Sequence, residues 1–411
     1  MTGPSGTVRT AARVPRDADA MRNETGDRGG NAAAKPGAPV RSAGAADRNE
    51  DTGTPVPSAD GVYGALDLGT NNCRLLVAKP SRRGFVVIDS FSRIIRLGEG
   101  VQATGRLADA AMTRTIAALR VCADKMRRRG VTRSRLIATE ACRIATNGTT
   151  FVDRVENETG LALEIVGRET EAKLAVSGCA SLLDRNCDWA LVFDIGGGSS
   201  ELIWLDLKKL GSARHSLNGR AGVQNCIAAW TSLPIGVVSL AERHGGRDVS
   251  MDRYEAMVED VMRALAGFES QYRFGERVEK DSAHFLGTSG TVTTISGIHL
   301  KLPRYDRARV DGCWLAAQDV RRVSNDLIDM SYAERVAQPC IGRERADLVL
   351  AGCAILEALL RTWPCQRLRV ADRGLREGIL TTLMTEDGHQ QRAPRPRRRR
   401  RGGRKKPANG S

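Results

Sequence analysis

Short apolar runs and stretches with helical spacing alternate between residues 61 and 387, and the two ends of the chain show neither pattern. Apolar runs bounded by Gly, Asp or Asn are typical of strands, and apolar residues at every third or fourth position indicate a helix face. Strands are predicted at 62–68, 73–80, within 84–101, at the start of 135–143, at 163–167, 189–197 and 199–207, and at the starts of 284–298 and 367–384. Helices are predicted at 107–129, 152–159, 169–183, 250–272 and 346–363, and at the ends of 284–298 and 367–384. Because strands and helices mix throughout, the predicted class is α/β.

The ends of the chain have a different composition. Residues 1–60 are rich in Gly, Ala, Pro, Asp and Arg, and such a segment cannot bury enough apolar surface to offset its ordering entropy. The tail at 386–411 carries ten Lys or Arg and no acid from residue 388 on, and so supplies most of the net charge of +15. Both ends are predicted to be disordered. The remainder is predicted to form one domain at 61–190 and another at 191–385, with the last helix free to pack back on the first domain.

The cysteines and the apolar runs bear on location. Ten cysteines stand singly, with no CxxC spacing and no Cys/His cluster, which favours reduced thiols over disulfides or a zinc site. The N-terminus lacks the apolar stretch of a signal peptide, and no run approaches the roughly 18 apolar residues of a membrane span. We therefore expect a cytoplasmic protein without a membrane partner.

One segment of the chain occurs twice, at an offset of 127 residues. The stretch ALDLGTNNCRLLV at 65–77 aligns with VFDIGGGSSELIW at 192–204, and apolar positions match on both sides. The aligned pairs are Asp67 with Asp194, Gly69 with Gly196, Asn72 with Ser199, Arg74 with Glu201, and Leu75 with Leu202. A period this long excludes a solenoid and indicates two similar domains, each with its own strand–turn–strand unit.

The residue types in these turns suit phosphate and a metal ion. A turn without Cβ atoms lets backbone N–H groups approach an oxyanion, and hydroxyls from Thr70, Ser199 and Ser200 add donors. Asp67 and Asp194 end their strands, where a carboxylate can hold Mg²⁺ directly or through water. The alternative is an ordinary Gly-rich turn with a solvated Asp, which two matched copies make less favourable.

Two other phosphate motifs fit poorly. The dinucleotide pattern G-x-G-x-x-G opens a helix, whereas the glycines here are followed by a second predicted strand. No G-x-x-x-x-G-K-[ST] sequence occurs. The turns are therefore interpreted as a phosphate-binding pair of another kind.

Further stretches carry a resemblance to a known family. They are ALDLGTNNCRLLVA, RIIRLGEGV, IATEACRIATNG, GRETEAKLAVSG, VFDIGGGSSEL, LPIGVVSLAE, FLGTSGTVTTISGI and DRGLREGIL, which together span roughly residues 64–380. Two phosphate hairpins and a third Gly loop at 286–291 resemble the actin, sugar kinase and Hsp70 superfamily. The order of the motifs more closely resembles the exopolyphosphatase and guanosine pentaphosphate phosphohydrolase (Ppx/GppA) family. The resemblance implies two ribonuclease H-like, actin-like domains that face each other across a cleft.

The resemblance also implies roles for individual residues. Glu171 corresponds to the proposed general base and Arg143 to a phosphate-binding arginine, and Asp194 and Glu201 are expected to hold Mg²⁺. The residues expected to bind substrate phosphate are Asp67, Gly69, Thr70, Asn71, Arg74, Arg143, Gly196, Gly197, Gly198, Ser199, Gly287 and Ser289. Arg93 or Arg96 can add positive charge. Because carboxylates near Mg²⁺ and Arg usually have depressed pKa values, we expect the same of Glu171. Glu140 and the Asn71–Asn72 pair depart from the residues common in the family.

Several of these residues have structural alternatives. Glu171 would otherwise be a solvated helix residue beside Lys173, and Arg143 would cap a local loop. Arg74 and Glu201 would otherwise pair with each other across the cleft. The loop at 287–291 suits either a nucleotide or a plain strand-to-helix turn. Arg373 and Arg376 are expected to be structural and are not assigned to the site.

The function implied is Mg²⁺-dependent release of terminal orthophosphate from inorganic polyphosphate by in-line attack of water. Removal of the 5′-phosphate of guanosine pentaphosphate is the alternative within the family. An ATP-dependent kinase and a binding module for polyphosphate or alarmone are the rivals from other classes. The expected partners are polyphosphate or guanosine pentaphosphate, polyanions such as RNA for the Arg-rich tail, and a second copy of the chain.

Overall fold

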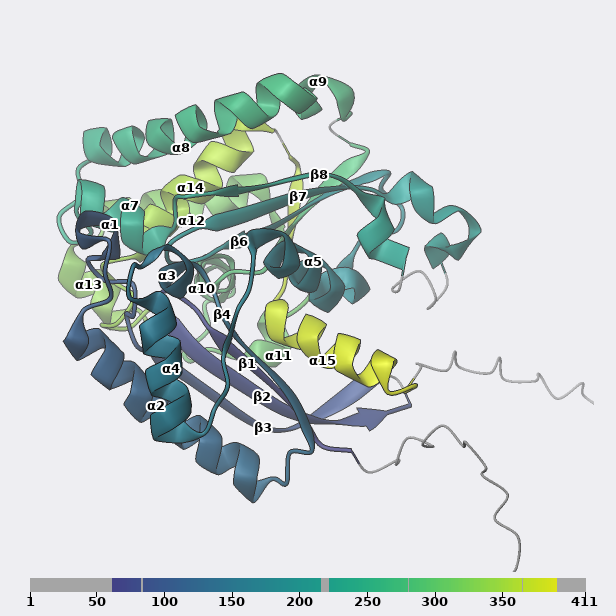
Figure 1. The fold of residues 1–411 in the computed structure, drawn as a ribbon. Helices are drawn as coiled ribbons and strands as arrows, with labels where there is room; N and C mark the ends of the chain where they lie inside the picture. Colours follow the sequence, from purple (N-terminus) through teal and green to yellow (C-terminus); the bar gives the residue numbers. More distant parts are fainter. Residues whose placement is uncertain (1–60, 83, 216–221, 280, 364, 390–411) are drawn as a thin grey trace, which may run out of the picture. The chain divides into compact units, whose positions relative to one another are not determined.

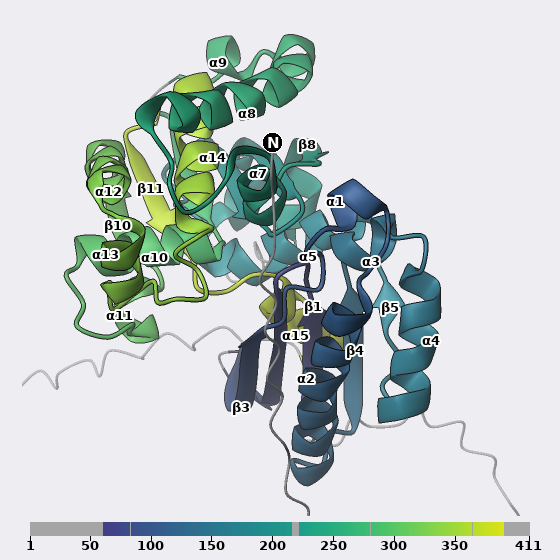
Figure 2. The same ribbon diagram turned by 90° about the vertical axis from the view of Figure 1, so that its left-hand side faces the viewer.

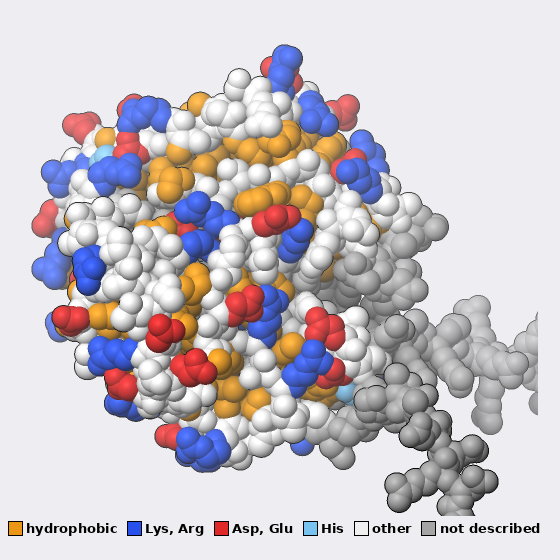
Figure 3. Space-filling view, viewed as in Figure 1, with side chains coloured by type: hydrophobic (Ala, Val, Ile, Leu, Met, Phe, Trp, Pro, Cys, Tyr) orange, Lys and Arg blue, Asp and Glu red, His pale blue; other side chains and the backbone are white. Residues whose placement is uncertain are grey.

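The structure is a computed structural model that describes residues 61–82, 84–215, 222–279, 281–363 and 365–389. The predicted extension at 1–60 and residues 390–411 of the predicted tail lie outside these residues. In Figure 3, positive and negative side chains are interspersed over the visible face of the described part, as its modest net charge suggests. Among the described residues, no helix combines the length and apolar character that crossing a membrane requires.

The first sheet has five strands in the order β3-β2-β1-β4-β5. They are β1 (Tyr63–Leu68), β2 (Asn72–Ser81), β3 (Gly84–Ile94), β4 (Arg133–Ala138) and β5 (Glu164–Ile165). β1 and β2 form an antiparallel hairpin in which Asp67 lies opposite Arg74. β1 also pairs with β4 in parallel, so one strand joins a hairpin to a parallel crossover.

The second sheet has six strands in the order β10-β11-β9-β6-β7-β8. They are β6 (Trp189–Ile195), β7 (Ser200–Asp206), β8 (Ile227–Leu233), β9 (Ala283–Gly287), β10 (Trp314–Ala316) and β11 (Arg367–Val370). Read from its hairpin edge, the order β8-β7-β6-β9-β11 repeats that of the first sheet. Asp194 lies opposite Glu201, which is the position that Asp67 and Arg74 occupy in the first hairpin. The sequence repeat at 127 residues is thus a repeat of topology and register.

Helices pack on the faces of both sheets (Figures 1 and 2). Those that precede β6 in the chain are α1 (Val101–Thr104), α2 (Asp109–Arg128), α3 (Glu140–Ile144), α4 (Gly148–Thr159), α5 (Arg168–Cys179) and the 3₁₀ turn η1 (Ala180–Leu182). Those that follow β7 are the 3₁₀ turns η2 (Leu207–His215) and η3 (Val223–Cys226) and the helices α7 (Val237–His244), α8 (Met251–Tyr272), α9 (Phe274–Arg277), α10 (Gly290–His299), α11 (Arg307–Val310), α12 (Ala317–Asp329), α13 (Tyr332–Ala337), α14 (Val349–Thr362) and α15 (Leu375–Glu386). The long α8 and the apolar α14 contribute to the core on the second sheet.

The last helix, α15, packs against the first sheet rather than the second. Its apolar residues Leu375, Ile379 and Leu383 share a buried cluster with Ala65 of β1 and Leu76 of β2. Figure 1 shows α15 beside α5 and close to β1. The C-terminal segment of the chain therefore completes the core on the N-terminal sheet.

Several elements differ from the predicted ones in extent. The segment after β4, predicted to be a loop, forms the short helix α3, and β5 keeps only two of its five predicted residues. β8 was not predicted as a strand, and α4 begins at Gly148 rather than at residue 152. The boundary at residue 190 falls inside β6, and Glu386, placed in the tail, ends α15. The division into two domains stays a prediction.

The crossing of α5 and α15 leads to the first testable prediction. A Cβ atom at Gly378 would overlap the carbonyl oxygen of Leu174, and one at Gly178 would overlap that of Gly374. Because backbone atoms cannot move aside cheaply, Gly378→Ala should lower the free energy of unfolding by roughly 3 kcal/mol. Urea denaturation of the full chain measures this change.

The same substitution at Gly267 is the matched control. Gly267 also lies inside a helix, α8, but a Cβ atom there would meet nothing within 4 Å. Gly267→Ala should therefore stabilise the protein by roughly 0.5–1 kcal/mol, as Ala does in an open helix interior. Equal effects of the two substitutions would show that the α5–α15 crossing tolerates a methyl group.

Candidate functional site

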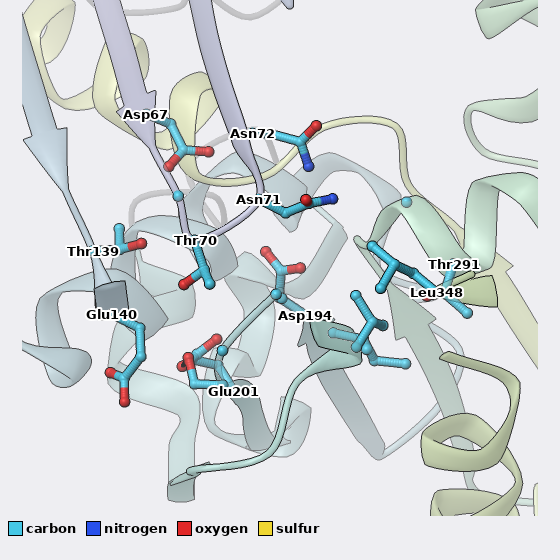
Figure 4. A pocket seen from close by; sticks show the side chains of 18 of the residues that line it. Asp67, Thr70, Asn71, Asn72, Thr139, Glu140, Asp194, Glu201, Thr291 and Leu348 are labelled. Atoms are coloured by element: carbon cyan, nitrogen blue, oxygen red, sulfur yellow. Dashed lines mark hydrogen bonds between the residues drawn. The ribbon is translucent and has the colours of Figure 1, made fainter. Parts of the chain in front are cut away.

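A pocket with an empty volume of about 960 Å³, part of it open to solvent, lies where the two hairpin turns meet. Figure 4 shows Asp67 from one hairpin, and Asp194 and Glu201 from the other, around the turn that carries Thr70 and Asn71. The lining residues are Asp67, Gly69, Thr70, Asn71, Asn72, Arg74, Thr139, Glu140, Glu171, Asp194, Ile195, Gly196, Gly197, Gly198, Ser199, Glu201, Val237, Gly290, Thr291, Thr294, Arg345, Leu348, Val349 and Leu375. The predicted residues of both hairpins are therefore brought together with Glu171, whereas Arg143, Gly287 and Ser289 do not line the pocket.

The two glycine turns touch each other, which gives a second reason for their composition. A Cβ atom at Gly198 would lie 2.9 Å from Thr70 Oγ1, and one at Gly197 would lie 3.0 Å from Thr70 Cβ and 3.2 Å from the Asn71 nitrogen. At such distances the neighbouring hairpin would have to shift to admit a Cβ atom. Gly197 and Gly198 thus allow the close approach of one hairpin to the other.

The turn after β6 also supports the beginning of α7. The carbonyls of Gly196 and Gly197 accept hydrogen bonds from Val237 (2.9 Å) and Val238 (2.8 Å), which satisfies amides that a helix start leaves unpaired. Gly236 lies against this turn without room for a Cβ atom. In the described part of the chain, no acceptor receives the amide protons of Gly197 or Gly198. These two amides are free to bind an anion, which is the role predicted for the backbone of the glycine turns.

The carboxylates of the two hairpins are buried, and burial raises their pKa values. It raises the pKa of Asp67 to about 6, although Arg74 and Arg376 oppose the change. It also raises the pKa of Asp194, again against the charge of Arg74. For Glu201, burial and then the facing Asp194 raise the pKa to about 7, while hydrogen bonds from Ser199 and Ser232 oppose them.

Glu171 has a pKa opposite in direction to the predicted one. Burial is the main cause that raises it well above its usual value, Glu201 adds to it, and the nearby Arg143 only partly offsets both. The prediction of a depressed pKa was wrong because it weighed the arginine without the desolvation of the carboxylate. The alternative of a solvated Glu171 beside Lys173 is also wrong, because Glu171 is largely buried and Lys173 pairs with Glu169 at 2.6 Å.

Arg143 is held by protein groups rather than exposed to the pocket. Its Nε and Nη2 donate to Glu140 Oε2 at 3.0 and 2.6 Å, its Nη2 lies 3.2 Å from Glu171 Oε2, and its Nη1 donates to the Val166 carbonyl. Burial by itself raises the pKa of Glu140, but hydrogen bonds from Arg168 and Arg143 outweigh it and lower the pKa. Glu140, the residue that departs from the family's usual one, therefore holds Arg143 in a position beside Glu171. Phosphate binding by Arg143 stays a prediction.

Two arginines that line the pocket have no carboxylate partner. Arg74 and Arg345 form no ion pair within the described residues, so the suggested pairing of Arg74 with Glu201 was wrong. Burial, followed by the charge of Arg74, lowers the pKa of Arg345. Arg345 was missed because it lies in none of the recognised motifs, and only the fold brings its loop to the pocket.

The third glycine loop contributes through residues next to the predicted ones. Gly287 packs against the ring of Phe193, and Ser289 caps α10 by accepting a hydrogen bond from the Val292 amide at 3.3 Å. The pocket is lined instead by Gly290 and Thr291, at the beginning of that helix. For Gly287 and Ser289, the strand-to-helix turn is thus the better-supported alternative.

The donor set fits a magnesium ion that is shared with substrate. Among the described residues, no three His, Cys, Asp or Glu side chains are placed to hold an ion by themselves. Mg²⁺, however, keeps several waters and needs only one or two carboxylates besides phosphate oxygens. Asp67, Asp194 and Glu201 line the pocket, and the buried Oδ1 atoms of Asn71 and Asn72 have no hydrogen-bond partner in the described structure.

Comparisons with known proteins agree with this geometry. A model of the Ppx/GppA phosphatase family matches residues 76–387. Exopolyphosphatase 2 of Mycobacterium tuberculosis is 27% identical over 332 residues, covering 78% of this chain and 97% of that protein. The crystal structure of an exopolyphosphatase-like protein has a TM-score of 0.68 and 28% identity, covering 79% of this chain and 98% of the other. The Ppx/GppA family member of Aquifex aeolicus has a TM-score of 0.64 and 27% identity, with 80% and 99% covered. The predicted fold class, mixed α/β with two actin-like halves, is confirmed.

The raised pKa of Glu201 leads to a prediction about stability in EDTA. A folded pKa of about 7, against 4.5 for the ordinary side chain, means that the native state holds the proton more tightly. The contribution of protonated Glu201 to the free energy of unfolding is fully present below pH 4.5 and is lost as the pH rises through 7. Relative to Glu201→Gln, wild-type protein should lose roughly 3 kcal/mol between pH 4.5 and 8, measured by urea unfolding.

Glu255 is the control, because its pKa is shifted in the opposite direction from that of Glu201. The hydrogen bond from Arg361 lowers its pKa, so its contribution to stability is present at neutral pH and is lost toward acid. Glu255→Gln should therefore become relatively less stable as the pH rises. A similar pH dependence of the two variants would contradict the burial argument for Glu201.

Proposed function

Because the chain belongs to the Ppx/GppA phosphatase family, we propose that it releases terminal orthophosphate from inorganic polyphosphate by attack of water. The observation that carries the proposal is one pocket that combines unpaired arginines, free loop amides and a buried glutamate. The relatives named exopolyphosphatase support polyphosphate as the substrate. Guanosine pentaphosphate is the alternative within the same family.

The positive groups of the pocket are suited to hold the terminal phosphates. Arg74 and Arg345 can each offer a planar pair of N–H donors to phosphate oxygens. The free amides of Gly197 and Gly198 and the hydroxyl of Thr70 lie in the same lining, whereas the Ser199 hydroxyl donates to Glu201 at 2.8 Å. Donors placed in advance around a transferred phosphoryl group stabilise the charge that spreads over its oxygens.

Glu171 is the group that we assign to proton transfer. Burial raises the pKa of Glu171, and an ionised carboxylate with a raised pKa is a stronger base than an ordinary glutamate. Arg143 and its partner Glu140 hold Glu171 in place at the beginning of α5. Glu171 would then accept a proton from the attacking water as the water oxygen bonds to the terminal phosphorus and the bond from that phosphorus to the bridging oxygen breaks, which releases orthophosphate and leaves the bridging oxygen on the shortened chain.

Mg²⁺ is the proposed cofactor, held by Asp194 and Glu201 with Asp67 nearby. When bound, it would neutralise charge on the phosphate oxygens during transfer. Burial and then the charge of Asp194 raise the pKa of Glu201, and a bound cation would oppose both effects.

We further place the protein in the cytoplasm, which the single spacing of its ten cysteines supports. The Arg-rich tail lies outside the described residues, so its contact with polyanions such as RNA stays a prediction. Association with a second copy of the chain also stays a prediction.

The proposed base can be tested by Glu171→Gln with Mg²⁺ and long-chain polyphosphate. Loss of a general base should reduce kcat by about 10²–10⁴ while substrate binding is kept. Glu169→Gln is the matched control, because Glu169 lies on the same helix but is exposed and, within the described residues, pairs only with Lys173. Phosphate release is measured with Mg²⁺ and with EDTA, and EDTA should abolish it.

The same assay separates the rival functions. Release of phosphate from guanosine pentaphosphate but not from polyphosphate would show that guanosine pentaphosphate is the substrate. Bound ADP on the purified protein would favour the kinase, and binding without turnover of either substrate would favour the binding module. Equal rates for wild type and Glu171→Gln would remove Glu171 from the chemistry.

A further inference from the structure

We propose that Glu140 is a resident anion of the active site: its carboxylate occupies an oxyanion position between Arg143 and Arg168 and thereby prevents these two arginines from retaining orthophosphate. This inference rests on the proposed function and deepens it, because orthophosphate is the product of the proposed reaction. Glu140 is then a specificity-determining residue, which sets how strongly the product inhibits the enzyme.

The carboxylate of Glu140 is held by two guanidinium groups. Arg143 donates to Oε2 through Nε at 3.0 Å and through Nη2 at 2.6 Å. Arg168 donates to Oε1 through Nη2 at 2.6 Å and to Oε2 through Nε at 3.2 Å. Paired N–H donors of a guanidinium group suit carboxylate and phosphate oxygens alike. The protein thus fills, with its own carboxylate, a position whose donors also suit a phosphate group.

This position lies next to the groups that bind phosphate in the proposed reaction. Glu140 lines the active-site pocket, whereas neither Arg143 nor Arg168 is part of the lining that the described residues form. A Cβ atom at Gly198 would lie 3.2 Å from Glu140 Cγ, so the Glu140 side chain lies against the turn whose amides are free. In Figure 4, Glu140 is seen on the Thr70 side of the pocket. An anion in place of the carboxylate would therefore be within the active site.

The proposed proton transfer also takes place beside these arginines. Arg143 Nη2 lies 3.2 Å from Glu171 Oε2 as well as 2.6 Å from Glu140 Oε2. Because Glu171 is the proposed base for the attacking water, orthophosphate would be released close to Arg143. In the absence of Glu140, the two arginines could hold the product near the place where it forms. With Glu140 present, Arg143 orients Glu171 instead.

The charge of Glu140 compensates the arginine pair. The Glu140 side chain is 2% exposed, and those of Arg143 and Arg168 are 17% and 39% exposed. Burial by itself raises the pKa of Glu140, but hydrogen bonds from Arg168 and Arg143 outweigh it and lower the pKa, so the carboxylate is charged at neutral pH. Without Glu140, Arg168 would lose its ion pair and Arg143 would keep only Glu171 within the described residues. Partly buried charge that lacks a partner is costly, which favours the binding of an anion from solution.

A second glutamate with two arginines supplies the contrast. Glu158 on α4 lies 2.6 Å from Arg120 and 2.6 Å from Arg154. Its side chain is 30% exposed, those of the arginines are 57% and 41% exposed, and Glu158 does not line the pocket. Water already solvates such a surface group, so removal of Glu158 leaves no strong anion site. Burial at the wall of the pocket is what distinguishes Glu140.

The test is the affinity of Glu140→Ser for orthophosphate, measured by calorimetry in chloride buffer with EDTA. Serine is short enough to leave room between the two arginines, and its hydroxyl can donate a hydrogen bond to an anion. The dissociation constant of orthophosphate should fall at least about tenfold relative to wild type, since one added contact with a charged donor is worth about that factor. Glu140→Asp keeps the negative charge and should bind orthophosphate as weakly as wild type.

Glu158→Ser is the matched control, because it also frees two arginines, and it should leave the dissociation constant unchanged. Thermal unfolding in chloride and in orthophosphate covers a loss of stability. Because a ligand of the native state stabilises it, orthophosphate should raise the midpoint of Glu140→Ser more than that of Glu158→Ser. A Glu140→Ser protein that folds only in orthophosphate would also support the inference. No gain in affinity or midpoint in Glu140→Ser, or an equal gain in Glu140→Asp or Glu158→Ser, would overturn it.

Product inhibition is the consequence for turnover. With Mg²⁺ and radiolabelled polyphosphate, unlabelled orthophosphate should inhibit Glu140→Ser at concentrations at least about tenfold lower than those that inhibit wild type. Equal inhibition of the two proteins would contradict the proposed role of Glu140.

Orthophosphate binding requires no turnover, which separates this inference from the proposed function. If wild type hydrolyses no polyphosphate but Glu140→Ser gains affinity for orthophosphate, the function is wrong and the resident anion stands. If wild type hydrolyses polyphosphate but Glu140→Ser gains no affinity, the function stands and the resident anion is wrong.

Discussion

The contact between two glycine turns is the constraint on which the site depends. Gly197 and Gly198 lie so close to Thr70 and Asn71 that a Cβ atom at either position would force the hairpins to shift. Because each turn follows a strand that ends in aspartate, this approach brings Asp67 and Asp194 into one pocket. The same turn uses its carbonyls to begin α7, so its shape is held from both sides. A repeated hairpin thereby becomes a single site with contributions from both halves.

The second constraint is electrostatic. The pocket buries several carboxylates, and within the described residues Arg74 and Arg345 form no ion pair, so the charge of Arg74 offsets the burial of Asp67 and Asp194 only in part. Buried, unpaired charge is costly and is kept where a ligand completes it. A divalent cation matches the carboxylates and a polyanion matches the arginines, and phosphoryl transfer requires both together.

The features that local pattern controls could be predicted from the sequence, and those that depend on distant contacts could not. The offset of 127 residues predicted both hairpins, and their register places Asp67 and Asp194 at equivalent positions. Arg345 could not be predicted, because its loop reaches the pocket only in the folded chain. The direction of the Glu171 pKa was missed for the same reason, since desolvation depends on elements far apart in sequence. The third loop was placed correctly but its lining residues were displaced to Gly290 and Thr291.

The packing of α15 on the first sheet has a consequence for the order of folding during synthesis. Strands β1 and β2 leave the ribosome some three hundred residues before the helix that covers them, and Ala65 and Leu76 stay without this cover until then. Contacts of such long sequence separation form late and slowly, and an incomplete sheet exposes apolar surface in the meantime. A nascent chain that stops before α15 would therefore expose this apolar face to chaperones, although both glycine turns would already have been made.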